Sequence, residues 1–256
     1  MRSVWIILVT LILASCASSP TTESTSDEGQ ELATTYKNMG IAYMRRGEIE
    51  RAQERLEKSH SLNENDPDTV HLLAEVYHRL GNTEQAALFY EQALALQPND
   101  PNFLNNYAGF LCTQQRYDEA EQIFIDIASR PNYDTPHFAY ENAGRCVLRQ
   151  DAQDKAEDYF SKALRIQPKL PISLFHMAEL KFAKGEYFKA RAYFERYLEV
   201  GQETPALLLL GYQIEKQLGA DEMAAQYAEK LVKHYRDSEQ TATLRAMQED
   251  EAQGME

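Results

Sequence analysis

The stretch that decides the fold is residues 68–100, DTVHLLAEVYHRLGNTEQAALFYEQALALQPND. Small residues at Ala74, Ala86 and Ala93 lie among larger apolar ones, Gly81 interrupts the pattern, and Pro98 follows it. An apolar run at helical spacing on each side of a glycine, closed by a proline, predicts two helices joined by a tight turn. We therefore expect a helix–turn–helix unit whose small residues lie where the two helices touch.

The same unit recurs along the chain. The small residue of the first helix returns at intervals of 34, 34, 36, 34 and 33 residues, as Gly40, Ala74, Ala108, Gly144, Ala178 and Gly211. The small residue of the second helix is Ala52, Ala86, Ala120, Ala156, Ala190 and either Ala224 or Ala225. This pattern resembles the tetratricopeptide repeat. It predicts an all-α fold, a right-handed superhelical solenoid of about six helix–turn–helix repeats. A generic helical bundle does not explain six units in register.

The repeat period also sets the expected boundaries of the individual repeats. Within residues 32–236 the repeats fall at 33–66, 67–100, 101–134, 137–170, 171–203 and 204–236. The longer interval arises at 131–136, PNYDTP, where we expect a lengthened turn. Residues 237–256 predict a capping helix, with Ser238 as its N-cap, and an acidic tail, EDEAQGME, that is disordered. We expect one solenoid rather than two domains.

The N-terminus reads MRSVWIILVTLILASC. Arg2 precedes an apolar run of about ten residues, which is half of what a membrane-spanning helix needs and is typical of a signal peptide. The residues that end at Cys16 resemble the bacterial lipobox, so we expect signal peptide 1–15 and lipidation of Cys16. The alternative is an ordinary signal peptide with an incidental cysteine. Residues 16–31, rich in Ser, Thr and acids, predict a flexible tether. Ala17, in place of Asp, favours lipid anchoring at the periplasmic face of the outer membrane.

Composition excludes several functions. The 256 residues carry a formal net charge of −14, which disfavours nucleic acid as a partner because binding to phosphates relies on Lys and Arg. The sequence holds no phosphate-binding glycine loop, no nucleophile elbow and no paired acid and base. We therefore expect no enzyme activity, no cofactor and no small-molecule substrate.

The first helix of each repeat is expected to line a concave groove. The outward positions of these helices give the candidate partner-binding residues Lys37, Ile41, Met44, His71, Glu75, His78, Asn105, Phe175 and Phe182. Four of them are apolar, and exposed apolar clusters mark partner sites. The alternative is that the chain's own tether or last helix covers them. The histidines share a helix face with Glu75, but no fourth ligand is obvious, so we expect a polar ligand surface and no metal site.

Two cysteines lie one repeat apart. Cys112 and Cys146 both fall late in the first helices of adjacent repeats, and neighbouring first helices pack side by side. An oxidising periplasm favours disulfides, so the spacing predicts a Cys112–Cys146 bond. The alternative is a pair of buried thiols that are too far apart to react.

Two segments match one family more closely than the general tetratricopeptide pattern does. NNYAGFLCTQQRYDEAEQIF (105–124) and ENAGRCVLRQDAQDKAEDYF (141–160) resemble the cysteine-bearing segments of the type IV pilus biogenesis/stability lipoproteins. Ala108 departs from the more usual glycine of that family. The resemblance covers about residues 31–240 and agrees with the lipobox and the tether.

This resemblance implies a pilotin. Such a lipoprotein binds subunits of the type IV pilus secretin, the outer-membrane pore, and promotes their localisation and multimerisation. Because the tether joins the first repeat, we expect the secretin contact in its groove, at Lys37, Ile41 and Met44. The alternative function is a periplasmic scaffold for peptidoglycan hydrolases or synthases.

Overall fold

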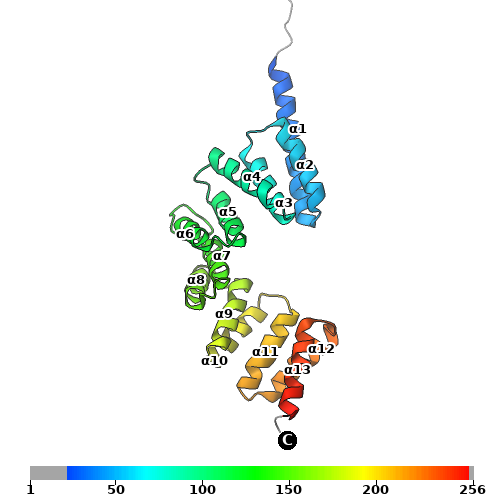
Figure 1. The fold of residues 1–256 in the computed structure, drawn as a ribbon, viewed down its shortest axis with the longest axis vertical. Helices are drawn as coiled ribbons and strands as arrows, with labels where there is room; N and C mark the ends of the chain where they lie inside the picture. Colours follow the sequence, from blue (N-terminus) through cyan, green and yellow to red (C-terminus); the bar gives the residue numbers. More distant parts are fainter. Residues whose placement is uncertain (1–21, 254–256) are drawn as a thin grey trace, which may run out of the picture. The chain divides into compact units, whose positions relative to one another are not determined.

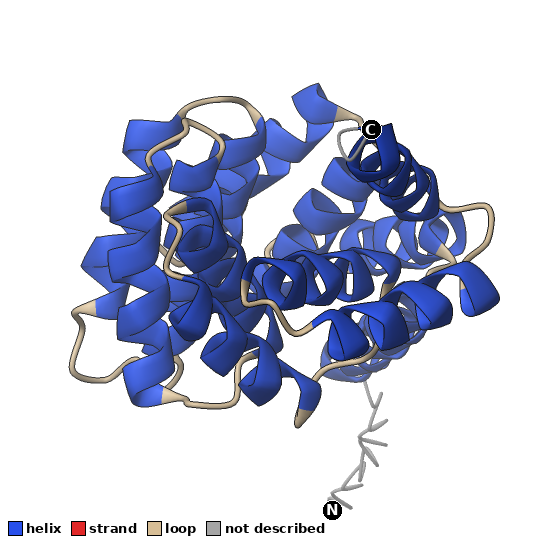
Figure 2. Cartoon of the chain, turned by 90° about the horizontal axis from the view of Figure 1, so that it is seen from below, coloured by secondary structure: helices blue, strands red, loops and turns tan. Residues whose placement is uncertain are grey.

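The computed structural model describes residues 22–253 and is built, over those residues, from thirteen helices without a strand (Figures 1 and 2). The helices are α1 (Thr22–Arg46), α2 (Ile49–Leu62), α3 (Pro67–Arg79), α4 (Thr83–Leu96), α5 (Pro101–Thr113), α6 (Tyr117–Ala128), α7 (Pro136–Leu148), α8 (Gln153–Ile166), α9 (Pro171–Ala183), α10 (Tyr187–Leu198), α11 (Pro205–Gln217), α12 (Asp221–His234) and α13 (Glu239–Gln253). They form six antiparallel pairs and one further helix. The predicted all-α repeat fold is confirmed.

Helix starts follow from the sequence. From α3 onward, the first helix of every pair begins with proline, whose fixed φ suits the first helical position and whose missing N–H has no partner there anyway. Asp66, Asp100 and Thr204 precede three of these prolines, and their side chains accept hydrogen bonds from backbone N–H groups of the first turn. Each such cap satisfies a donor that the helix itself leaves unpaired.

The turn inside each pair needs one residue with positive φ. Gly47, Gly81, Gly185 and Gly219 fill this position with φ of 70–76°. In the third and fourth pairs the position belongs to Gln115 and Asp151, with φ of 62° and 58°. Side chains other than glycine are strained in this conformation, so these two turns are less favourable than the other four.

Helix α1 begins earlier than expected. Residues 22–31, predicted as part of a flexible tether, belong to it, so that part of the prediction is wrong. Good helix formers such as Glu28 and Glu31 continue the helix of the first repeat. Asn63 at the end of α2 donates to Gln30 Oε1 at 3.0 Å, which ties the added turns to the repeat.

The described chain divides into two compact units, with a boundary between Phe89 and Tyr90 inside α4. A single solenoid had been expected. In the first unit, residues of α1, α2 and α3 form the core around Leu56 and Leu73. In the second unit, two clusters centred on Phe124 and Phe160 fill the third to sixth pairs, and a third covers the start of the last helix.

The last helix behaves as a cap. Helix α13 lies beside α11 and α12 (Figure 1). Ser238 Oγ accepts from the backbone N–H of Thr241 at 3.2 Å, and Leu244 is fully buried among residues of α11 and α12. The acidic tail differs from the prediction, because residues 249–253 are helical rather than disordered. Glu251 pairs with Lys216 of α11 at 3.4 Å, which helps to hold this end. None of the helices in 22–253 is sufficiently long and apolar to span a bilayer.

Candidate partner-binding surfaces

Lys37 joins α1 to the next repeat. Its ammonium lies 3.0 Å from Asp66 and 3.5 Å from Asp68, and only 18% of its side chain is exposed. Burial lowers the pKa of Lys37, but the two carboxylates outweigh it and the net pKa is raised. Burial likewise opposes the ionised form of Asp66, yet its hydrogen bonds to Thr69 and Lys37 leave the pKa of Asp66 lowered. Lys37 was predicted as a partner ligand, and the structure assigns it a role between repeats.

Glu141 holds the equivalent position of α7. This carboxylate is buried and accepts hydrogen bonds from Ser173 of α9, at 3.1 Å from the backbone N–H and 2.7 Å from the hydroxyl. Asn105 in α5 occupies the same position and accepts from Asn142 Nδ2 of α7 at 3.3 Å. The fifth position of the first helix therefore points toward the neighbouring repeat, and Asn105 is only partly available to a partner.

Met44 was expected to face solvent, and it does not. Its exposed fraction is 8%, and it packs with Leu56, Leu73 and Val76 in the core of the first unit. The twelfth position of the first helix lies between neighbouring repeats, which a generic list of outward positions overlooks. Ile41, one turn earlier, is half-buried.

The histidine face of α3 is also more buried than predicted. His71 is 7% exposed, and its Nε2 lies 3.6 Å from Glu75. Burial and then the nearby Arg79 lower the pKa of His78, which is half-buried on the same helix. Across residues 22–253, no group of three or more His, Cys, Asp or Glu side chains has the geometry to hold a metal.

Phe175 and Phe182 are half-buried rather than exposed. Both pack against the core cluster of the second unit, and their rings lie 6.1 Å from Tyr197 and 5.5 Å from Tyr187, respectively. The alternative that the chain covers its own apolar residues therefore describes them better. The covering residues come from the adjacent helix α10 rather than from the tether or the last helix.

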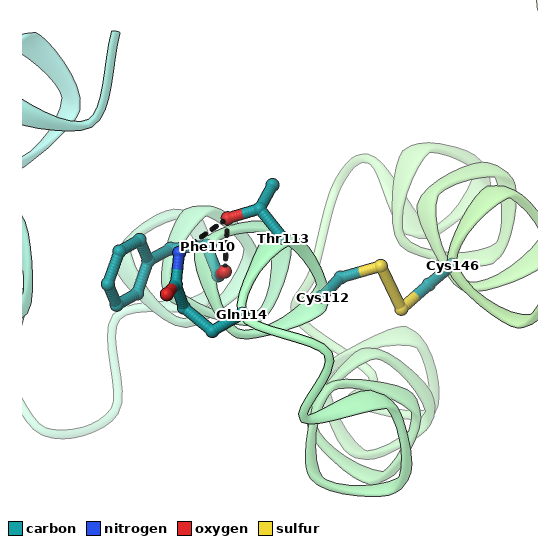
Figure 3. The surroundings of a disulfide bond; sticks show 5 residues. All are labelled: Phe110, Cys112, Thr113, Gln114 and Cys146. Atoms are coloured by element: carbon teal, nitrogen blue, oxygen red, sulfur yellow. Dashed lines mark hydrogen bonds between the residues drawn. A yellow bond between two sulfur atoms is a disulfide. The ribbon is translucent and has the colours of Figure 1, made fainter. Parts of the chain in front are cut away.

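Cys112 and Cys146 form a disulfide that joins α5 to α7 (Figure 3). Their Cα atoms are 5.8 Å apart, within the range that a disulfide requires. Both cysteines are buried. On the α5 side, Thr113 donates to the carbonyl of Phe110 at 2.7 Å and closes the end of the helix. The bond closes a loop that contains α6 and the long 131–136 turn.

The sequence did not single out the apolar surface that the first repeat exposes. Leu32 and Met39, seven residues apart on α1, are 44% and 37% exposed. In four later repeats the residue equivalent to Met39 is buried in a cluster with residues of the preceding repeat: Leu73, Ala143, Met177 and Leu210. Met39 thus belongs to a stacking face against which no earlier repeat lies in residues 22–253, and Leu32 is exposed two helical turns before it. We call this pair the open stacking edge.

The predicted lipidation at Cys16 and the signal peptide 1–15 lie outside the described residues. They remain predictions of the sequence.

Comparison with known proteins agrees with the helix pairs. Four family models described as tetratricopeptide repeat match residues 31–99, 81–136, 111–171 and 173–200. A tetratricopeptide repeat protein of Parabacteroides merdae shares the fold with a TM-score of 0.62 at 22% identity, covering 83% of each chain. The fold and its interlocking repeats therefore define the class, which is a tetratricopeptide-repeat protein.

Closer relatives identify the family. The type IV pilus assembly protein PilF of Pseudomonas aeruginosa is 30% identical over 236 residues, covering 91% of this chain and 94% of the relative. The structure of P. aeruginosa PilF matches with a TM-score of 0.76 over 87% of this chain and 99% of that one. The structure of PilW, a widely conserved type IV pilus biogenesis factor, matches with a TM-score of 0.75 at 28% identity, covering 83% of this chain and 97% of that one. The chain belongs to the PilF family.

Proposed function

We propose that this protein is a non-enzymatic assembly factor for the type IV pilus, a lipoprotein at the periplasmic face of the outer membrane. It binds the pilus secretin and promotes its localisation and multimerisation. The observation that carries this proposal is the 30% identity to a pilus assembly protein over 91% of the chain. The lipobox-like residues before Cys16 support the anchor, and lipidation would concentrate the repeats at the membrane where secretin subunits arrive.

In the first unit, two of the three residues that the sequence favours for the secretin contact are engaged within the fold. Lys37 is occupied by Asp66 and Asp68, and Met44 is in the core. The open stacking edge remains exposed on the helix that follows the proposed anchor. A repeat normally buries this face against a neighbouring helix, so the edge suits an amphipathic helix of the secretin that stacks as one more element.

The double variant Leu32→Asp/Met39→Asp tests this surface in a strain that lacks the wild-type gene. We expect heat-resistant secretin multimers to be lost on a denaturing gel, because two carboxylates cannot be buried against an apolar helix face. Met223→Asp/Val232→Asp on α12 is a matched control, since those residues are 42% and 37% exposed. The control should leave multimers intact, and both purified variants should keep their helical circular dichroism.

The outcomes separate the function from the site. Normal multimers in the deletion strain would overturn the assembly role, and cell-wall defects there would favour a peptidoglycan scaffold instead. Multimers lost in the deletion strain but normal with Leu32→Asp/Met39→Asp would overturn only the proposed surface.

The anchor has its own test. Replacing Cys16 by Ser should release the protein from the outer-membrane fraction into the soluble periplasmic fraction. Retention of this variant in the membrane fraction would contradict lipid anchoring at Cys16.

A further inference from the structure

Helix α1 has two different sides. Within the described chain it packs mainly against α2 and α3 at the start of the first unit (Figure 1), and Ala33, Gly40 and Met44 are buried on that side. The other side is exposed at alternating steps of four and three residues: Glu28, Leu32, Thr35, Met39, Ala42 and Arg46. We call these six residues the α1 seam. The open stacking edge is part of it.

The spacing of the α1 seam is that of one side of a coiled coil. Two helices that wrap around each other repeat their contact every seven residues, which is a step of four followed by a step of three. The ends of the seam carry opposite charges, Glu28 and Arg46, and the four residues between them are uncharged. A stripe with this pattern suits a second helix whose charges run in the opposite order.

We propose that the α1 seam binds the same seam of a second copy of this chain, with the two helices antiparallel about a two-fold axis. Such an axis makes every contact occur twice. The alignment that matches the charged ends places opposite each other Glu28 and the partner's Arg46, Leu32 and the partner's Ala42, and Thr35 and the partner's Met39. Each uncharged layer combines a larger with a smaller side chain, which lets facing residues interdigitate.

Residues beside the seam favour the antiparallel arrangement as well. Glu31, Asn38 and Arg45 are exposed and follow one another at intervals of seven residues along one flank. In the antiparallel dimer Glu31 lies beside the partner's Arg45, and Asn38 meets the partner's Asn38 at the axis, where two amides can hydrogen-bond each other. In a parallel dimer each seam residue would face its own copy, so the two Glu28 carboxylates would repel, and so would the two Arg46 guanidinium groups.

The dimer covers Leu32 and Met39, so a second copy and a secretin helix exclude each other from the open stacking edge. This regulation rests on the proposed function: the dimer keeps the edge covered until a secretin subunit displaces one copy. The seam is short, so it pairs weakly in solution. Helix α1 begins at Thr22, six residues after Cys16, and lipid anchoring there would raise the effective concentration of one seam near another.

Cysteine cross-linking tests whether the two seams meet. The purified chain without residues 1–16 keeps every helix of the structure, and its remaining cysteines, Cys112 and Cys146, are bonded to each other. In this chain Asn38→Cys should form a disulfide-linked dimer on a non-reducing gel, because the two copies of this residue meet at the axis. Lys58→Cys on the exposed surface of α2 is the control, and it should stay monomeric.

The direction of the partner helix has its own readout. Glu28→Cys alone and Arg46→Cys alone should stay monomeric, because in the antiparallel seam two copies of the same end residue lie about 27 Å apart at 1.5 Å per residue. A mixture of the two variants should cross-link, since each places its thiol opposite the other. Cross-linking of Glu28→Cys with itself would show a parallel contact and contradict the arrangement.

Sedimentation velocity over a range of protein concentrations measures the strength of pairing. Glu28→Arg and Arg46→Glu should each raise the dimer dissociation constant about tenfold or more, because each sets like charges opposite one another. Glu28→Arg/Arg46→Glu exchanges the signs and should restore the wild-type constant to within about twofold. Lys58→Glu changes the net charge as Arg46→Glu does and should leave pairing unchanged. All variants alter exposed side chains and should keep their helical circular dichroism.

Several results would overturn the proposal. The wild-type chain stays monomeric at every concentration, or Asn38→Cys cross-links no more than Lys58→Cys, or Glu28→Arg/Arg46→Glu pairs no better than either single variant. These measurements use no secretin, whereas multimers in the deletion strain test the proposed function. Either can therefore fail without the other.

Discussion

The contact between the first two repeats and the contact between the third and fourth repeats use the same helix position in different ways. In the first unit, Lys37 reaches from α1 to the carboxylates at the start of α3. In the second unit, Asn105 makes only a 3.3 Å hydrogen bond with Asn142, and a disulfide joins the same two helices. One contact is electrostatic and reversible, whereas the other is covalent.

Strained backbone turns also distinguish the third and fourth repeats from the first two. The third and fourth repeats contain Gln115 and Asp151 at turn positions that other repeats give to glycine. They also contain the long 131–136 connection. The Cys112–Cys146 bond spans this connection, so the covalent link lies where the local backbone is least favourable. A repeat protein can thus keep its register through unfavourable turns if a stronger contact holds the first helices together.

Loss of the disulfide is expected to have the largest effect. The bond closes a loop of 34 residues, which stabilises the fold by about 4 kcal/mol in the chain-entropy account. Urea unfolding with and without a thiol reductant should show this loss for the wild type. The Cys112→Ala/Cys146→Ala variant should unfold at lower urea and respond to reductant no further. Equal midpoints for reduced and oxidised wild type would contradict the role of the bond.

The helix-packing glycines offer the next comparison. A Cβ at Gly144 would lie 2.8 Å from the ring of Phe160, and a Cβ at Gly40 would lie 2.6 Å from Leu56. We expect Gly144→Ala to destabilise the protein by about 2 kcal/mol, because overpacking forces buried groups apart. Gly40→Ala should cost less, since an aliphatic side chain adapts more easily than a ring. Thermal melts rank the two variants, and a larger loss for Gly40→Ala would reverse this assignment.

Removal of the charged contact is expected to have a smaller effect. Asp66→Ala removes both a helix cap and a partner of Lys37, and should destabilise by about 1–2 kcal/mol at pH 7. Because the pKa of Asp66 is lowered in the fold, its contribution is present above the ordinary value of 3.8 and is lost as the pH falls below it. The pKa of Lys37 is raised in the fold, so the stabilisation that its charged form contributes is present below its ordinary pKa and is lost only above about pH 10.5.

Chemical denaturation at pH 7 and pH 3 measures this dependence. The difference between the wild type and Asp66→Ala should shrink at the lower pH. Asp66→Asn keeps a capping side chain but not the charge, and should fall between the two. A difference that does not change with pH would show that Asp66 acts only as a neutral cap.

The turn residues are expected to have the smallest effect. Gln115→Gly should stabilise the protein by about 1 kcal/mol, since glycine adopts positive φ without steric strain. The reciprocal change, Gly47→Ala, should destabilise by a similar amount. Thermal melts of both variants test the pair, and a loss of stability in Gln115→Gly would mean that the glutamine side chain contributes more than the strain it carries.

Most of the fold was predictable because the repeat period fixes the register of every helix pair. The start of α1 was not, because the composition of residues 22–31 resembles a linker although several of its residues favour helix. The prediction that the groove candidates are exposed failed for a different reason. The positions of Met44 and His71 face outward on an isolated helix pair but lie against neighbouring repeats in the stack.

The exposed surfaces were harder to predict than the core. Met39 holds a position that is buried in other repeats, and only the structure shows that no earlier repeat covers it within the described residues. Sequence spacing also does not reveal which cations pair across helices, such as Lys155 with Glu121 and Arg191 with Glu215. The cysteine pair was simpler, because both residues lie late in the first helices of adjacent repeats, which pack side by side.

The most direct test of the whole account is the amount of heat-resistant secretin multimer in a deletion strain that carries Leu32→Asp/Met39→Asp or Met223→Asp/Val232→Asp. We predict that multimers are absent with the first variant and present at wild-type level with the second, at equal protein abundance. Multimers at wild-type level in the deletion strain itself would contradict the proposed role in assembling the secretin.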